Sequence, residues 1–177
     1  MAQADATPEI NMATGILKWA VVAIVVANEV CASATGSEPG RHASLVLVGS
    51  TAIWLLPGSE TTKMKCFVVC WSICLVVFPL LFIVDDLRRT EDEVAERLSH
   101  VPTISPMIAF IWGSAGYVHG ALPFGPRWRI PLLCAVQLLT TLRCLNLCVI
   151  TRQFWLPVLA ASLACLPCTV GFWLCTR

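Results

Sequence analysis

The feature of this sequence that most constrains its fold is a series of long apolar segments separated by short polar ones. An α-helix needs about 20 apolar residues to cross the hydrocarbon core of a bilayer, with a working range of about 17–25. Backbone groups inside a bilayer must bond to one another, so only helices and closed barrels can span it. The apolar segments lie at residues 16–34, 43–57, 66–84, 106–124, 130–150 and 154–175. They predict an all-α fold, a polytopic transmembrane helix bundle of six spans that forms a single membrane domain over residues 1–177.

Segment 43–57 leaves an alternative open. It is shorter than the usual range for a spanning helix, although a tilted helix or a locally thinned bilayer would allow it to cross. The alternative to six spans is therefore five spans with one re-entrant segment.

The first segment can also be interpreted in two ways. Lys18, the apolar run after it and Ala32-Ser33-Ala34 follow the order of a secretory signal peptide, whose cleavage would remove residues 1–34. Acidic residues precede the run and interrupt the approach to the cleavage site. We therefore favour a first transmembrane helix.

The composition supports the membrane assignment and excludes some partners. Apolar residues make up 57% of the chain and charged residues 13%, whereas soluble domains have about 25% charged residues. The sequence predicts an integral, multi-pass protein whose partner is the lipid bilayer, in a compartment that can be organellar or endomembrane. The net charge of +1, with no block of basic residues, gives no basis for binding nucleic acid. The ten cysteines lie in or beside apolar segments, which favours helix packing over disulfides.

The polar connection at residues 85–100 has helical features of its own. Its apolar residues keep helical spacing, and Thr90 with Glu93 forms a capping-box pattern. Arg89 and Arg97 lie four residues either side of Glu93, so we expect both to pair with it. Pro102 follows. The segment predicts a short amphipathic helix at the membrane interface or against a partner, with a solvated loop as the alternative.

Glu29 and Arg143 are the charged residues that fall inside the apolar segments rather than at their ends. A charge near the bilayer centre costs at least about 2.5–3.5 kcal/mol on insertion scales, so it is rarely without a role. Both residues lie slightly beyond the middle of odd-numbered spans, which run in the same direction. We therefore predict that they form an intramembrane ion pair, which either fixes the register of the helices or serves a transport site. Beside Arg143, a polar helix face is formed by Gln137, Thr140, Thr141, Cys144 and Cys148.

The cysteines include one pattern that suggests an enzyme. Cys165-Leu166-Pro167-Cys168 is similar to the thioredoxin redox motif, and a CxxC pair in a membrane resembles the quinone-linked thiol oxidoreductases of the DsbB and vitamin K epoxide reductase families. Those families pass electrons through a second cysteine pair in a loop, which this sequence lacks. Burial in an apolar segment also disfavours the reactive thiolate. Cys66, next to basic residues, is a candidate for palmitoylation.

The sequence favours a protein without catalytic activity. It contains no pattern for a metal site or a cofactor. We expect a structural or accessory subunit of a larger membrane complex, whose partners would be other membrane-protein subunits. The alternative is a small transporter or channel that uses Glu29 and Arg143, and the third hypothesis is a thiol oxidoreductase that uses Cys165 and Cys168.

Overall fold

The computed structural model describes residues 8–55, 57–122 and 126–176, and its regular elements are all helices. Residues 123–125 and Leu56, which fall within or beside predicted spans, lie outside the described residues, as does Arg177. The helices are α1 (Pro8–Thr35), α2 (Glu38–Ala52), the 3-10 turn η1 (Ile53–Leu55), α3 (Glu60–Arg88), α4 (Glu91–Ser99), α5 (Val101–Ala121), α6 (Pro126–Thr151) and α7 (Trp155–Thr176).

Hydroxyl side chains fix the starts of three helices. Ser37, Ser59 and Thr90 each accept a hydrogen bond from a backbone N–H in the first turn of the helix that follows. These bonds satisfy amide groups that have no partner within the helix. Between α1 and α2 the chain reverses at Gly36, whose φ of 59° lies in the left-handed region that favours glycine.

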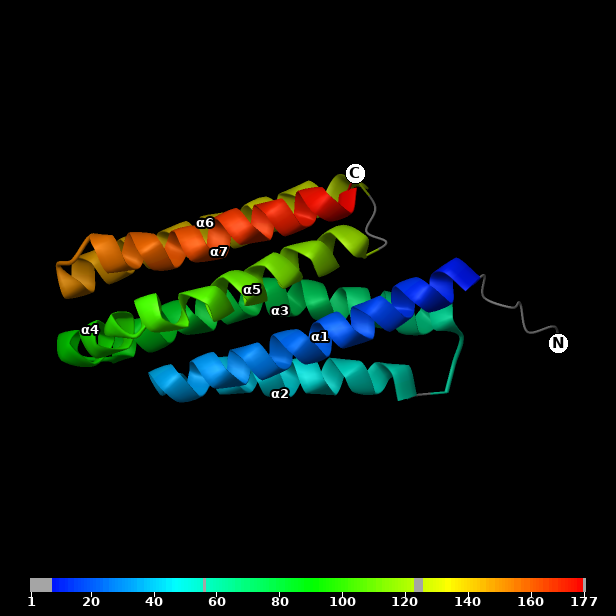
Figure 1. Cartoon of the computed structure of the whole chain (residues 1–177), viewed down its shortest axis with the longest axis horizontal. Helices are drawn as coiled ribbons and strands as arrows, with labels where there is room; N and C mark the ends of the chain where they lie inside the picture. The colour runs from blue at the N-terminus through cyan, green and yellow to red at the C-terminus, as the bar shows by residue number, and fades with distance from the viewer. Residues whose placement is uncertain (1–7, 56, 123–125, 177) are drawn as a thin grey trace.

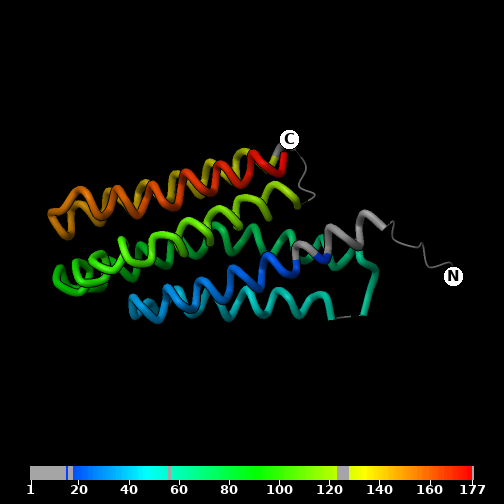
Figure 2. The backbone as a smooth tube through the Cα atoms, viewed as in Figure 1, coloured from blue at the N-terminus to red at the C-terminus, as the bar shows by residue number. Residues whose placement is uncertain are grey.

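The long helices form two layers and alternate in direction (Figure 1). One layer contains α1, α5 and α7, and the other contains α2, α3 and α6. Contacts within the layers join α5 to α1 and α7, and α3 to α2 and α6, while α1 with α2 and α6 with α7 join the layers. Figure 2 shows the chain passing back and forth between the two ends of the bundle. In Figure 1, α7 finishes at the end where α1 begins.

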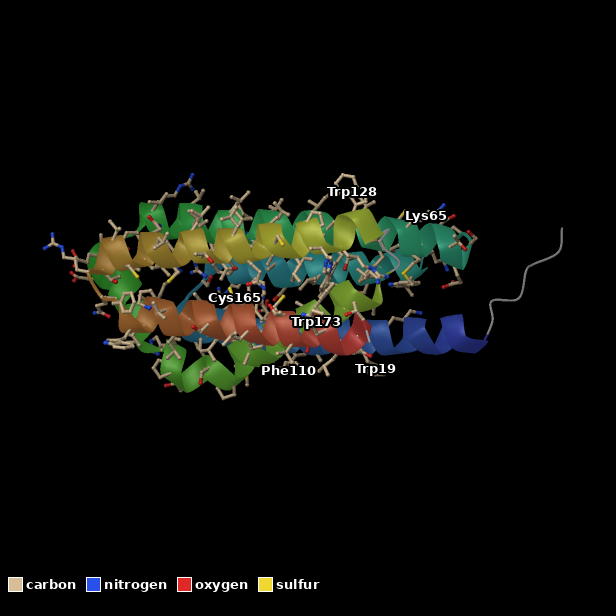
Figure 3. The ribbon with its side chains drawn as sticks, turned by 90° about the horizontal axis from the view of Figure 1, so that it is seen from above. Trp19, Lys65, Phe110, Trp128, Cys165 and Trp173 are labelled. Carbon is tan, nitrogen blue, oxygen red and sulfur yellow. The ribbon has the colours of Figure 1, made fainter. Side chains whose placement is uncertain are left out.

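Within the described residues, five helices are long and apolar enough to cross a membrane: α1, α3, α5, α6 and α7. Their outer faces are apolar, as the lipid-facing surface of a membrane bundle must be. Trp19 is 76% exposed and Trp128 71% exposed. Figure 3 shows Trp128 on the outer side of α6 and Phe110 on the opposite face of the bundle. These features support an integral membrane protein.

The predicted segment 43–57 corresponds to most of α2 followed by η1. The 15 residues of α2 and the 3 of η1 extend for about 28 Å, close to the roughly 30 Å of a hydrocarbon core. The helix α2 is not among the five helices that qualify as membrane spans by length and composition. However, it runs from the end of α1 to the start of α3, at opposite ends of the bundle (Figure 1). This path is that of a crossing segment, so six crossings stay our prediction.

The closest helix pair, α5 and α7, packs on small residues. A Cβ atom at Gly116 would overlap the backbone carbonyl of Cys168, and one at Gly171 would overlap the carbonyl of Gly113. Such close approach of backbones is typical of membrane helices with small residues at the contact. Cys168 is buried at this crossing, which agrees with the packing role inferred for the cysteines.

Candidate functional site: a central cavity with a charged end

A partly open cavity of about 250 Å³ lies between the helices of the bundle. Its walls come from α1 to α7, and α3 and α5 face each other across it. Most of the lining is apolar: Ile24, Leu47, Trp71, Leu75, Phe78, Phe82, Val94, Leu98, Ile104, Ile108, Ile111, Trp112 and Leu147, with several alanines of α7. The charged lining residues Asp86, Arg97 and Arg143 lie towards the α4 end of the helices. The site is therefore an apolar chamber with a charged end.

Arg143 has a different ionic partner from the predicted one. Its Nε donates to Asp86 Oδ2 at 2.7 Å and its Nη2 to Asp86 Oδ1 at 3.3 Å, a two-point ion pair between α6 and α3. The Asp86 side chain is only 2% exposed. Glu29 takes no part in this pair, and the predicted Glu29–Arg143 ion pair is therefore wrong.

The error arose from the end of the third span. We predicted that it finishes at residue 84, whereas α3 continues to Arg88 and carries Asp86 on its inner face. A long arginine side chain in a membrane helix extends towards the nearest polar end, where a carboxylate is cheaper to accommodate. A signal was present in the sequence, since Phe78, Phe82 and Asp86 recur at four-residue intervals and share one helix face.

The guanidinium of Arg143 is held on two sides. Its Cζ lies 4.6 Å from the centre of the Phe82 ring, a cation–π contact. The Arg143 side chain keeps 33% of its surface exposed. Arg143 also lines the cavity, so a molecule inside would contact this side chain.

A second charged group fixes α4 across the same end of the bundle. Arg97 donates to Asp85 at 2.6 Å and to the carbonyl of Gly36 at 2.7 Å, and Arg89 donates to Asp85 at 3.2 Å. Both arginines thus form their close ion pairs with Asp85 and not with Glu93 as predicted, although both still attract the Glu93 carboxylate at longer range. Arg97 links α4 to α3 and to the turn between α1 and α2.

The helix predicted within residues 85–100 is present as α4, with its capping box. Thr90 Oγ1 accepts from the amide of Glu93, and the Glu93 carboxylate accepts from the amide of Thr90 at 3.0 Å. The buried residues Val94 and Leu98 pack with Val101 and Leu147. The apolar face of α4 therefore covers the end of the bundle and contributes to the cavity wall.

The predicted polar face of α6 is divided among several environments. Thr140 and Cys144 line the cavity, whereas Thr141 is exposed. Gln137 donates to the carbonyl of Cys165 and to Thr169, both at 3.3 Å, so it joins α6 to α7. Thr140 and Thr141 donate to backbone carbonyls of their own helix. Cys148 is half-buried and absent from the lining. The face does not form a continuous polar path through the bundle.

The cysteines singled out in the sequence occupy different settings. Cys165 and Cys168 are free thiols, half-buried and buried respectively, in the part of α7 that packs against α5 and α6. Cys66 is exposed near the start of α3, as an acylation site must be, and its palmitoylation stays a prediction. Among the described residues, no group of three or more His, Cys, Asp or Glu side chains is placed to hold a metal ion.

Comparison of the chain with protein-family models, with curated proteins and with solved structures finds no match. The fold and the cavity therefore define the class: an all-helical bundle with several helices suited to a membrane.

The capping box gives a prediction about α4. Replacing Thr90 by alanine removes the side-chain cap, at a cost of about 1 kcal/mol, and should speed hydrogen exchange of residues 91–99 roughly fivefold. Ser99→Ala, at the other end of the helix, is the control and should change exchange little. Equal exchange in Thr90→Ala and the wild type would show that the cap does not stabilise α4.

The same cap should respond to acid. The amide of Thr90, which donates to the Glu93 carboxylate, lowers the pKa of Glu93 below its usual value. A lowered folded-state pKa means that the stabilisation is present above the unfolded pKa and disappears as pH falls through the folded one. The contribution should thus be complete at neutral pH and be lost progressively as pH falls below the ordinary glutamate pKa of about 4.3. Glu93→Gln at neutral pH should mimic this loss.

Proposed function

We propose that this chain is a non-catalytic, multi-pass membrane protein that binds one small molecule with an apolar chain in its central cavity. The observation that carries the proposal is the cavity itself, about 250 Å³ in volume and bounded by every helix from α1 to α7. Well-packed helix bundles leave few voids larger than a water molecule. Pockets for small molecules are typically apolar, about 300–1,000 Å³, with a few polar groups that orient the ligand. The cavity has that composition and lies near the lower limit of that range.

The lining also bears on the transporter or channel hypothesis. An ion or strongly polar solute needs polar groups along its path to replace its water, and most of this wall is apolar. The ends of the helices carry the charges instead. This distribution favours an apolar ligand with a polar end over an ion pathway that uses Glu29 and Arg143.

The accessory-subunit hypothesis is compatible with this proposal, because a ligand-binding membrane protein can also belong to a complex. Nothing in the described part of the chain identifies a surface for a protein partner, so that role stays a prediction. The oxidoreductase hypothesis has less support, since Cys168 is packed against Gly116 at the helix crossing.

The proposal can be tested with a diazirine-bearing alkyl alcohol, photolysed with the full chain in nanodiscs. Adducts on Phe78, Phe82 and Ile108 should be competed away by the same alcohol without the diazirine, because a cavity saturates. Adducts on the outer surface, such as those at Trp128, should persist because the bilayer does not saturate.

An occluding variant makes the test specific. Ala161 is half-buried and lines the cavity, so Ala161→Phe should remove the saturable adducts. Leu166→Phe, on the exposed side of the same helix with 67% of its surface accessible, should leave them. Helix content measured by circular dichroism shows whether each variant is folded. If the folded wild type gives no saturable adducts on lining residues, the proposal is wrong.

A further inference from the structure

The guanidinium of Arg143 has hydrogen-bonding capacity that the protein does not use. Its Nε and Nη2 bind the two oxygens of Asp86. Within the described part of the chain, its Nη1 group makes no hydrogen bond, although an arginine can donate five. The Arg143 side chain is one-third exposed and lines the cavity, so its unused donors favour a ligand that carries acceptor oxygens.

The charges at this end of the cavity do not cancel. Asp85, Asp86, Arg89, Arg97 and Arg143 are connected by ion pairs in two groups. From the α4 cap, outside the cavity, the Glu93 carboxylate also attracts Arg89 and Arg97. The charged residues that line the cavity itself are Asp86, Arg97 and Arg143, and this lining cluster carries a net charge of +1. One negative charge at the Arg143 end of the chamber would balance the lining cluster, and a buried charge without such balance is costly.

The cavity is elongated along the helices. On α3 it extends from Trp71 to Asp86, and on α5 from Val101 to Ala115. Fifteen residues of helix correspond to about 22 Å. An elongated chamber of about 250 Å³ suits a single extended chain.

From these observations we infer that the ligand is a single-chain amphipathic monoanion, of which a long-chain carboxylate is the simplest example. Its anionic group binds Arg143 beside Asp86, and its chain lies between α3 and α5 towards Trp71. This inference rests on the proposed function and specifies the substrate class of the same cavity.

The test compares three competitors of equal chain length, a carboxylate, an alcohol and an amine, against the saturable adducts of the diazirine alcohol. In the wild type, the ionised carboxylate should compete at least about tenfold more strongly than the alcohol, because it forms a charge-assisted hydrogen bond. The amine should compete least, because its charge has the same sign as the cluster.

A double variant removes the anion site while leaving no unpaired charge. In Asp86→Asn combined with Arg143→Gln, the carboxylate and the alcohol should compete equally, while the alcohol still binds and so reports an intact cavity. If the carboxylate has no advantage in the wild type, or keeps it in the double variant, the inference is overturned. The proposed function would then still stand, because it fails only if no competitor of any charge displaces the probe.

Discussion

Replacing Asp86 by asparagine is expected to destabilise the bundle by about 3 kcal/mol, because it leaves the Arg143 guanidinium without its counter-charge. Removal of one member of a buried ion pair costs about 3–5 kcal/mol. We expect the lower end of that range, since the Arg143 side chain is one-third exposed. The loss should be measurable as a lower midpoint of thermal unfolding in detergent.

Two further variants make this result diagnostic. Asp86→Asn combined with Arg143→Gln should recover much of the loss, because the remaining groups are neutral amides. Glu29→Gln should change stability by less than about 0.5 kcal/mol, as expected for a substitution away from such networks. If Glu29→Gln is as destabilising as Asp86→Asn, the assignment of Asp86 as the partner of Arg143 is contradicted.

Replacing Gly116 by leucine should have an effect of similar or larger size. The first added carbon would overlap the carbonyl of Cys168, so α5 and α7 could no longer keep their present separation. Overpacking typically costs about 1–3 kcal/mol and occasionally more, and we expect roughly 3 kcal/mol or more here because the obstacle is backbone. Gly171→Ala should also destabilise, since its added carbon meets the carbonyl of Gly113.

Gly49 provides the matched control for this experiment. It also lies within a helix, but a Cβ atom there would meet nothing within 4 Å. Gly49→Ala should therefore leave the unfolding midpoint unchanged or raise it slightly, as helix propensity favours alanine by up to about 1 kcal/mol. Equal effects of Gly116→Leu and Gly49→Ala would contradict the close α5–α7 contact.

The sequence predicted the helices well because length and apolarity determine whether a segment can cross a bilayer. It also predicted α4, since a capping box and helical spacing are local features that need no knowledge of the remaining chain. The capping carboxylate of Glu93 was correctly placed for the same reason. Its predicted close ion pairs do not form. Arg89 binds Asp85 one turn earlier at the end of α3, an i,i+4 pair, and Arg97 binds the same carboxylate from α4, a contact that depends on how α4 folds back.

The partner of Arg143 was missed for a related reason. Asp86 lies two residues beyond the predicted end of its span, so it falls outside the apolar segments in which an intramembrane ion pair is expected. Helices of a membrane bundle commonly extend past the hydrocarbon core, so a charge near a helix end can still face the interior. The cavity could not be predicted at all, because it depends on the spacing of α3 and α5 across the two layers rather than on any local pattern.

The most direct measurement is the identity of the small molecules that the purified full chain retains. Organic extraction followed by mass spectrometry, with the wild type and Ala161→Phe purified in parallel, would reveal them. Our account predicts a singly charged acidic amphipath with one chain, retained in stoichiometric amount by the wild type and depleted in the variant. Equal amounts of every extracted lipid from the two folded proteins would contradict the claim that the central cavity is a binding site.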